Sequence, residues 1–430
     1  YRKYTYHEMH SYSLDAIGEY ELNERKVDYE GTLDQLYNND FEKFIAYSRQ
    51  DVDLLVKLDA KLQFIDLANV LAHSNTVLLQ TTMGAVAQTD QAILNEAHAQ
   101  GLICPDKRYD KDTTSAAGAY VATPKKGMHK WVGSIDLNSL YPSIIRSCNM
   151  STETIIGQVR QVYTKELIAN AKTVAEAWEG RFACPEYELV MQKNIEEILH
   201  LDFEDGTSFE ATGAEIYEIV FNSGQPWIIS ANGTIFTYEK KGVIPGLLER
   251  WYAERKVLQA KARDARAEGG DKFAYWDKRQ LVKKINLNSL YGALLNPGSR
   301  FFDSRLGQST TLTGRCIAKH MAGELNKIIA GEYNHQGDAI VYGDTDSTYF
   351  SAYPMLKEQI KKGEINWDRD NIIAYYDAVC EEVNKTFPGF MSNTFHTTLE
   401  LGSIIAAGRE MVGSAGIFIT KKRYAMLVFD

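Results

Sequence analysis

Two acidic residues, Asp344 and Asp346, lie at the centre of the segment 342–347, which reads Tyr-Gly-Asp-Thr-Asp-Ser. Apolar runs flank this segment at 339–341 and 348–350. A Gly-containing turn between two such runs is typical of a β-hairpin, and strand residues two apart face the same side. Because like charges repel, two carboxylates at a hairpin tip favour a hard divalent cation with oxygen ligands. An isolated Asp-X-Asp is more often a solvated turn, but a second acidic strand end favours the cation site here.

That second acidic end is Asp136, which follows the apolar run 131–135 and precedes a bend and a helix that we expect to begin near Pro142. A strand, an acid, a bend and a helix together present a carboxylate and several backbone N–H groups to a phosphate. Asp136 and Asp346 are therefore expected to hold two Mg²⁺ ions roughly 3.5–4 Å apart, for phosphoryl transfer. In the alternative interpretation Asp136 caps a helix, a role that Asn138 or Ser139 fits equally well.

A third group of polar residues lies in a helix expected at 272–295. Lys284, Asn288 and Tyr291 are spaced i, i+4 and i+7 and therefore share one face. A cation, an amide and an aromatic ring suit a triphosphate and the adjacent base pair. Arg255, in a helix expected at 244–267, can approach the same phosphates from an antiparallel partner helix. Taken singly, each charge is more often a solvated helix residue.

Two weaker signals lie near the ends of the sequence. Residues 421–424 read Lys-Lys-Arg-Tyr after a strand-like run and suit contact with a nucleic-acid backbone or minor groove. Tyr47 and Asp51 place a phenol and a carboxylate one turn apart on a helix, which by itself is usually a surface face.

Hydrophobic spacing predicts the elements that must position these residues. Residues 1–63 are expected to be helical, most clearly over 34–64, with a continuation through 69–79. After an irregular stretch at 107–115, we expect strands at 131–135, 216–221, 227–238 and 339–350, a hairpin turn at Asp205-Gly206, and helices at 244–267, 272–295 and 312–330. The helices at 244–267 and 272–295, joined by Gly269-Gly270, form an antiparallel helical hairpin.

Composition restricts the class of protein. With 430 residues, of which 44% are hydrophobic, the chain is long enough for two or more domains. It has no apolar run of the roughly 18 residues that a membrane helix needs, so we expect a soluble protein with no membrane partner. Its five Cys residues are widely separated, which argues against a disulfide framework or a zinc site and favours a reducing compartment.

The net charge of −10 is unusual for a protein that binds phosphates. Residues 176–218, however, contain twelve acidic and two basic residues, which accounts for the whole excess. The rest of the chain is about neutral, so a basic surface elsewhere is compatible with the composition. The sequence starts at Tyr1 without Met or a leader, which leads us to expect a piece of a longer chain.

The combination of motifs resembles the family B DNA polymerases, most closely those of T-even-like bacteriophages. The resemblance is carried, in the order of that family, by the segments 136–144 (DLNSLYPSI), 284–292 (KINLNSLYG), 342–347 (YGDTDS) and 421–424 (KKRY). Four such motifs in the right order rarely arise by chance.

The resemblance implies the role of each candidate residue. Asp136 and Asp346 resemble the metal ligands, with the Leu137 carbonyl as a backbone ligand and Asp344 as a catalytic neighbour that tunes coordination. The residues implied in dNTP binding are Ser139, Leu140 and Tyr141 around the triphosphate, Arg255 and Lys284 on the fingers, and Asn288 and Tyr291 under the nascent base pair. Tyr141 resembles the steric gate that excludes a 2′-hydroxyl, and Lys421, Lys422, Arg423 and Tyr424 resemble the segment that contacts primer-template DNA. Tyr47 and Asp51 match the third exonuclease motif, and residues 118–120 match the motif that links the exonuclease domain to the palm.

An α+β fold is implied: a palm, made of an antiparallel sheet with helices on one face, a helical-hairpin fingers subdomain, and a mainly helical remnant of a 3′-5′ exonuclease. The implied domains are 1–105 (exonuclease remnant), 106–130 (linker), 131–243 (first palm part, with an acidic insertion at about 156–221), 244–296 (fingers) and 297–430 (second palm part without a thumb). The first two exonuclease motifs are absent from the sequence, and Gln259 stands where the family has a second fingers cation.

The expected function is a DNA-directed DNA polymerase that uses two Mg²⁺ ions, dNTPs and primer-template DNA, in the cytoplasm of a host cell if it is encoded by a phage. Exonuclease and thumb portions are expected on the same or a separate chain, and a sliding clamp only through a C-terminal tail that is absent here. One alternative is a non-catalytic DNA-binding module descended from a polymerase, which the retained Asp136 and Asp346 disfavour. A palm enzyme that makes RNA is disfavoured by Tyr141.

Overall fold

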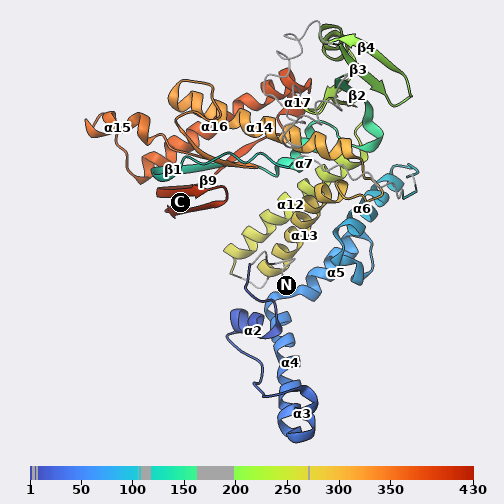
Figure 1. Ribbon diagram of the computed structural model, residues 1–430, viewed down its shortest axis with the longest axis vertical. Helices are drawn as coiled ribbons and strands as arrows, with labels where there is room; N and C mark the ends of the chain where they lie inside the picture. Colours follow the sequence, from blue (N-terminus) through green and yellow to red (C-terminus); the bar gives the residue numbers. More distant parts are fainter. Residues whose placement is uncertain (2–4, 6–7, 105, 108–117, 162–197, 270–271) are drawn as a thin grey trace.

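The computed structural model describes residues 1, 5, 8–104, 106–107, 118–161, 198–269 and 272–430. Helices and two antiparallel sheets of five strands each make up this part of the chain (Figure 1). The expected α+β class is therefore confirmed.

The large sheet has the strand order β10-β9-β1-β8-β7. Its strands are β1 (Gly127–Leu137), β7 (Ile340–Asp344), β8 (Ser347–Phe350), β9 (Ala407–Thr420) and β10 (Arg423–Val428). The expected hairpin at 339–350 is confirmed as β7–β8. Strand β1 begins four residues before the expected start at 131, because Gly127 to Lys130 pair with the distal half of β9. The sheet thus joins segments more than two hundred residues apart in the chain.

Helices cover one face of the large sheet. They are α7 (Leu140–Ser147), α14 (Ser304–Ala330) and α16 (Arg369–Phe395), which run along the sheet in Figure 1. Helix α14 starts two turns before the helix expected at 312–330, because Asp303 caps it by accepting a hydrogen bond from the Arg305 N–H at 2.9 Å. Alternate strand residues divide between the two faces. Phe350 is buried under the helices, whereas its neighbour Tyr349 packs on the opposite face.

An aromatic cluster lies on that opposite face. It contains Tyr342, Tyr349, Phe418 and Tyr424, whose ring centroids lie 4.9–6.1 Å apart. The rings come from four strands, so they fasten the β7–β8 hairpin to the β9–β10 hairpin.

The small sheet has the order β4-β3-β2-β6-β5. Its strands are β2 (Ile155–Gln161), β3 (Ile198–Phe203), β4 (Ser208–Thr212), β5 (Trp227–Ile229) and β6 (Thr234–Thr237). The expected turn at Asp205-Gly206 is confirmed between β3 and β4, with Gly206 at a φ of +87°. The prediction of a strand at 216–221 was wrong. These residues belong instead to α11 (Gly213–Tyr217) and to the π-helical turn η4 (Glu218–Asn222). Ile216 and Val220 are buried against this sheet whereas Glu218 between them is exposed, and a strand would place all three side chains on the same face.

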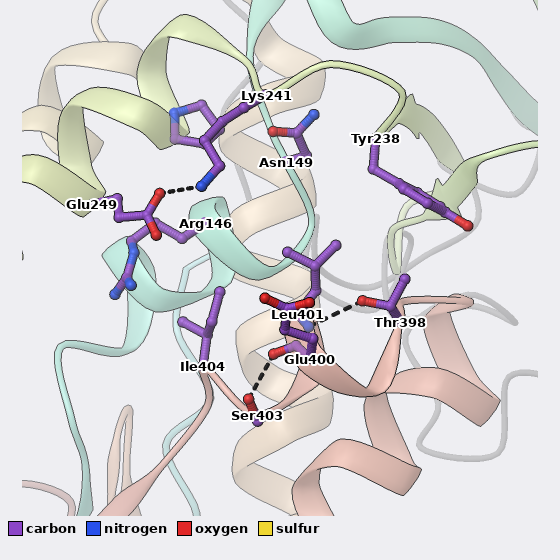
Figure 2. Close-up of a pocket in the computed structure, with 11 residues that line it drawn as sticks. Arg146, Asn149, Tyr238, Lys241, Glu249, Thr398, Glu400, Leu401, Ser403 and Ile404 are labelled. Atoms are coloured by element: carbon purple, nitrogen blue, oxygen red, sulfur yellow. Dashed lines mark hydrogen bonds and ion pairs between the residues drawn. The ribbon is translucent and has the colours of Figure 1, made fainter.

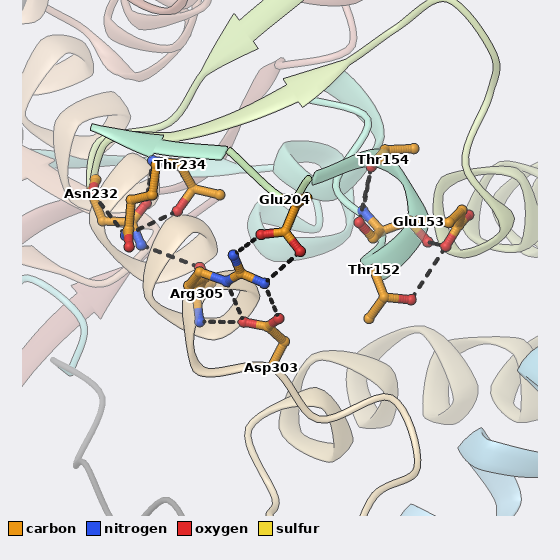
Figure 3. Close-up of polar contacts among 10 residues, drawn as sticks. Thr152, Glu153, Thr154, Glu204, Asn232, Thr234, Asp303 and Arg305 are labelled. Atoms are coloured by element: carbon orange, nitrogen blue, oxygen red, sulfur yellow. Dashed lines mark hydrogen bonds and ion pairs between the residues drawn. The ribbon is translucent and has the colours of Figure 1, made fainter. Parts of the chain in front are cut away.

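An ion-pair network connects the small sheet to the start of α14 (Figure 3). The Arg305 guanidinium contacts the carboxylates of Glu204 and Asp303. A short helix, η2 (Thr152–Thr154), precedes β2. More than half of the acidic insertion expected at about 156–221 lies outside the described residues, at 162–197.

The helical hairpin consists of α12 (Val243–Ala267) and α13 (Lys272–Leu294), which pack along their length. Their bounds differ by one residue from the expected ones. Leucines on the inward faces, such as Leu247 and Leu290, join the main core with α7 and α14.

The N-terminal part is helical but more divided than expected. Its helices are α2 (Leu14–Leu22), α3 (Leu33–Asn39), α4 (Phe41–Leu62), α5 (Phe64–Asn75), η1 (Leu79–Met83) and α6 (Ala85–Ala99). The prediction of a continuous helix over 34–79 was wrong. The helix is interrupted at Asp40, which caps the start of α4, and at Gln63 and Thr76, which adopt left-handed φ values of +55°. Helices α2–α4 extend away from the large sheet in Figure 1, whereas α5 and α6 pack on α13. Two further helices, α15 (Tyr353–Lys361) and α17 (Leu399–Gly402), complete the C-terminal half.

Within the described ranges, every helix is too short or too polar to cross a membrane.

Candidate active site

The turn between β7 and β8 carries Asp344, Thr345 and Asp346 at one end of the large sheet. Thr345 adopts a left-handed φ of +59°, and the Asp346 N–H donates to the Asp344 carbonyl at 2.7 Å. This tight turn gives the two carboxylates different surroundings, although they are two residues apart in sequence.

Asp136 and Asp346 lie on adjacent strands. Asp136 pairs with Ser347 in the antiparallel register of β1 and β8, and the Leu137 N–H donates to the Asp346 carbonyl at 2.9 Å. The two acids, 210 positions apart in sequence, therefore meet at the same end of the sheet, as the motifs predicted.

Their environment disfavours two negative charges. Burial, the charge of Asp346 and the charge of Glu410 raise the pKa of Asp136 from 3.8 to about 7. Burial also raises the pKa of Asp346, with added repulsion from Asp344 and Glu410. A cation bound between the carboxylates would relieve this repulsion.

Sequence reasoning missed Glu410. This residue lies in β9 where the pairing with β1 shifts register between Ser134 and Ile135, and its carboxylate accepts a hydrogen bond from the Ser134 hydroxyl at 3.3 Å. The shift turns an exposed acid toward the Asp136–Asp346 pair, and no local sequence pattern marks such a bulge.

The donor set suits a hard divalent cation. Asp136 and Asp346 offer carboxylate oxygens, and the adjacent backbone can add a carbonyl such as that of Leu137. In the part of the chain that the structure describes, no cluster of three or more His, Cys, Asp or Glu side chains has a metal-site arrangement.

The carboxylate of Asp344 contacts Lys422 of the β9–β10 turn. Its two oxygens lie 2.9 and 3.0 Å from the Lys422 ammonium, and they also accept hydrogen bonds from the hydroxyls of Tyr342 and Thr345, each at 3.1 Å. The Lys422 N–H in turn donates to the Tyr342 hydroxyl at 2.9 Å. Asp344 is thus held by the β9–β10 turn.

Helix α7 begins just beyond Asp136 with an open N-terminus. Ser139 is the residue before the helix, with a left-handed φ of +50°, and its side chain makes no capping hydrogen bond. Asp136 does not cap α7 either, so the capping interpretation of this acid was wrong. The helix starts at Leu140 rather than near Pro142, and the N–H groups of its first turn receive no capping hydrogen bond from the Ser139 side chain.

Tyr141, in the first turn of α7, stacks on Tyr291 of α13. Their ring centroids are 4.1 Å apart with an interplanar angle of 24°. A side chain at Gly314 of α14 would meet the Tyr141 ring at 3.3 Å, so the ring is confined on that side as well. The two stacked rings form a packed surface, called the floor below, where the helical hairpin meets the large sheet.

Polar residues continue from this floor along α13. Lys284 and Asn288 are exposed, and Arg255 of α12 donates a hydrogen bond to Gln280 at 3.4 Å. A cleft of about 370 Å³ opens beside Gln280, and it is lined by Lys256, Gln259, Ala262, Arg263, Arg266, Phe273, Asp277 and Gln280. The structure therefore brings Arg255, Lys284, Asn288 and Tyr291 onto one side of the hairpin.

The segment Lys421–Tyr424 forms the turn and the start of β10. Lys421 and Arg423 are exposed, and Lys422 has a left-handed φ of +61°. The Tyr424 hydroxyl lies 2.6 Å from the Tyr349 hydroxyl. Tyr424 therefore anchors the turn, while the basic side chains remain accessible.

The segment 118–125 runs along the outer side of β7. The Thr345 N–H donates to the Tyr120 carbonyl at 2.8 Å, and the N–H groups of Ala122 and Lys125 donate to Gly343 and Val341. This stretch, expected to be a linker, thus supports the acidic turn directly.

Tyr47 and Asp51 lie far from this site in sequence, on α4. Lys26 binds both, at 2.6 Å from the Tyr47 hydroxyl and 2.8 Å from the Asp51 carboxylate. One oxygen of Asp51 is buried and has no hydrogen-bond partner among the residues that the structure describes. Sequence reasoning missed Lys26, which has no recognisable motif.

A separate pocket of about 490 Å³ lies behind α7 (Figure 2). Its polar lining includes Arg146, Asn149, Tyr238, Lys241, Glu249 and Glu400, with Lys241 and Glu249 paired. None of the candidate site residues lines it.

Comparison with known proteins gives a consistent result. The profile of DNA polymerase family B matches residues 76–363. The chain is 27% identical to the DNA-directed DNA polymerase of Escherichia phage RB69, with 100% of this chain and 48% of the relative covered. It is 25% identical to that of Enterobacteria phage T4, with 100% and 49% covered, and 22% identical to DNA polymerase 1 of Pyrococcus abyssi, with 78% and 31% covered. The chain thus spans about half the length of the phage relatives.

Proposed function

The chain belongs to DNA polymerase family B, and we propose that it is the palm and fingers of a DNA-directed DNA polymerase, which adds dNTPs to a primer 3′-hydroxyl. The phage relatives carry that name and match the whole chain. Replication of viral DNA in the cytoplasm of a host cell is the corresponding biological setting.

The observation that supports this function most is the pairing of β1 with β8, which brings Asp136 and Asp346 together. Nucleotidyl transfer requires carboxylates that hold cations between a primer end and a triphosphate. The raised pKa values of both acids fit a site that becomes stable when it is occupied by cations.

The cofactor is proposed to be two Mg²⁺ ions, held by Asp136, Asp346 and the Leu137 carbonyl. When bound, such ions lower the pKa of the attacking hydroxyl and stabilise the leaving pyrophosphate. The carboxylates of this chain orient the cations, and the buried sheet behind them keeps the carboxylates in place. Asp344 acts indirectly, since both of its oxygens are engaged by other residues.

The nucleotide is proposed to lie between α7 and the helical hairpin. N–H groups around Ser139, Leu140 and Tyr141 at the open N-terminus of α7 suit the triphosphate, because such ends favour anions. Arg255 and Lys284 contribute positive charge from the fingers. The stacked Tyr141–Tyr291 pair, with Asn288, forms the surface under the sugar and the new base pair, and Tyr141 excludes a 2′-hydroxyl.

We propose the same domain assignment that the resemblance in sequence implies. Residues 131–243 and 297–430 are the palm, residues 244–296 the fingers, residues 106–130 a linker and residues 1–105 part of a 3′-5′ exonuclease domain. Within that part, Tyr47 and Asp51 are remnants of an exonuclease site. Lys421, Lys422, Arg423 and Tyr424 face primer-template DNA, and the remaining exonuclease and thumb portions, with a clamp-binding tail, are supplied by the same or another chain.

Primer extension tests this function. The protein is incubated with primer-template DNA, Mg²⁺ and either dNTPs or rNTPs, with and without the remaining polymerase portions. We expect template-directed incorporation of dNTPs, and loss of incorporation in Asp346→Asn with unchanged circular dichroism. DNA binding without incorporation under every condition would instead favour a non-catalytic module, and normal incorporation by Asp346→Asn would contradict the assignment of the site.

A further inference from the structure

Lys422 forms an ion pair with Asp344, the acid of the β7–β8 turn that is not one of the proposed cation ligands. Its ammonium contacts both oxygens of Asp344, at 2.9 and 3.0 Å, across two separate hairpins. The Tyr342 hydroxyl connects the same residues, since it accepts from the Lys422 N–H and donates to Asp344. These contacts attach the β9–β10 turn to the β7–β8 turn that carries Asp344 and Asp346.

The two partners differ in their freedom to leave this contact. The Asp344 side chain is 19% exposed, whereas the Lys422 side chain is 67% exposed. Exposed ion pairs contribute little free energy, and a lysine side chain is long and flexible. Lys422 can therefore exchange Asp344 for a stronger anion, while Asp344 stays where its hydrogen bonds with Tyr342 and Thr345 hold it.

A stronger anion is available beside the turn if the proposed function holds. Lys421, Lys422 and Arg423 form a continuous exposed basic turn, to which a phosphate backbone is attracted. Asp344 shares the tight turn with Asp346, whose N–H donates to the Asp344 carbonyl at 2.7 Å, so the Asp344–Lys422 ion pair lies beside the proposed cation site. Withdrawal of Lys422 toward DNA leaves the negative charge of Asp344 uncompensated next to that site.

We propose that Lys422 is a positioning residue that couples duplex binding to cation binding. In the free protein it neutralises Asp344 and weakens the attraction of the Asp136–Asp346 site for divalent cations. When primer-template DNA draws Lys422 away, Asp344 adds its charge to the site and cations bind more tightly. By linkage, bound cations increase the affinity for duplex DNA by the same factor. The inference rests on the proposed function for the identity of the duplex.

The test measures Mn²⁺ affinity by electron paramagnetic resonance, with no nucleotide present. Each protein is titrated alone and with a saturating duplex whose primer ends in a dideoxynucleotide, and saturation is checked by fluorescence anisotropy. In the wild type, DNA should tighten Mn²⁺ binding. In Lys422→Met, the free protein should already bind Mn²⁺ more tightly, by roughly fivefold, and the gain on adding DNA should shrink correspondingly.

Matched variants separate this coupling from a general loss of positive charge. Lys421→Met removes the same charge one residue away and should leave the Mn²⁺ affinity of the free protein at the wild-type value. The effect of Lys422→Met should largely disappear in an Asp344→Asn background, because the lysine then has no carboxylate to neutralise. The proposal is overturned if Lys422→Met binds Mn²⁺ no more tightly than the wild type, or if Lys421→Met has the same effect. Primer extension by the wild type reports on the proposed function separately, so the two failures are distinguishable.

Discussion

The Leu137 N–H donates a hydrogen bond to the Asp346 carbonyl, and this contact aligns the strand end that carries Asp136 with the turn that carries Asp346. The contact is between backbone groups, so it holds the backbones of the two acids together whether or not their carboxylates are ionised. The sheet therefore keeps the two acids side by side even when both carry a negative charge.

Replacing one carboxylate should weaken cation binding and yet stabilise the cation-free fold. Asp136→Asn keeps the shape of the side chain and removes the repulsion with Asp346 and Glu410. We expect Mn²⁺ affinity to fall at least tenfold, because a charged ligand is lost, while the melting temperature without cations rises at pH 8. Asp338→Asn, at a carboxylate that is 95% exposed, is the control. A lower melting temperature for Asp136→Asn would contradict this account.

The pH dependence follows from the raised pKa of Asp136. Its pKa is 3.8 in the unfolded chain and about 7 in the folded protein, so its contribution to stability is present below about pH 4 and is lost as the pH rises through about 7. Cations bind the ionised form, so their affinity should increase with pH and level off above about 7. Thermal unfolding from pH 5 to pH 9, with and without Mg²⁺, measures both effects. The dependence should be much weaker in Asp136→Asn.

Tyr141 should control the choice of sugar. Because its ring is confined between Tyr291 and Gly314, Tyr141→Ala opens space under the nucleotide. We expect discrimination against rNTPs in single-turnover incorporation to fall, on the order of 10²-fold. Tyr141→Phe retains the ring and should retain discrimination. Equal discrimination by the alanine variant would show that another residue contacts the sugar.

Replacing Gln259 with lysine should strengthen the binding of dNTPs. It lines the cleft on the fingers beside Lys256 and Arg263, one turn beyond Arg255. Gln259→Lys adds a cation that can reach a triphosphate, so the KM for dNTPs should fall severalfold, and the gain should diminish at high salt. Gln259→Met, similar in length but uncharged, should show no gain.

The amide pair Asn75–Asn286 should stabilise the junction of α5 with the fingers. Both side chains are buried, and each donates to the other at 3.0 Å. Asn286→Ala leaves Asn75 partly unsatisfied and should lower the free energy of unfolding by about 1–3 kcal/mol. Denaturant unfolding of the single variants and of Asn75→Ala/Asn286→Ala should give a cost for the double variant below the sum of the two singles. Additive costs would show that the pair is not coupled.

Local patterns were sufficient where an element depends on its own residues. The fingers helices have residues with high helix propensity and a glycine turn between them, and the β7–β8 hairpin has apolar runs around a tight turn. Both were predicted with bounds within one or two residues. The same reasoning gave the wrong element for residues 216–221. A mainly apolar segment of that length is compatible with either a strand or a buried helix, and here the packing against the small sheet stabilises the helix.

Residue types and spacing alone determined which side chains of this protein could do chemistry: the acids at 136, 344 and 346, the polar face of α13 and the basic turn. Only the tertiary structure decided how the acids divide between roles. Strand pairing across more than two hundred residues joined Asp136 to Asp346, a register shift added Glu410, and the β9–β10 turn engaged Asp344 through Lys422. The reason is that electrostatic interactions depend on distance and burial, which are set by contacts between segments remote in sequence.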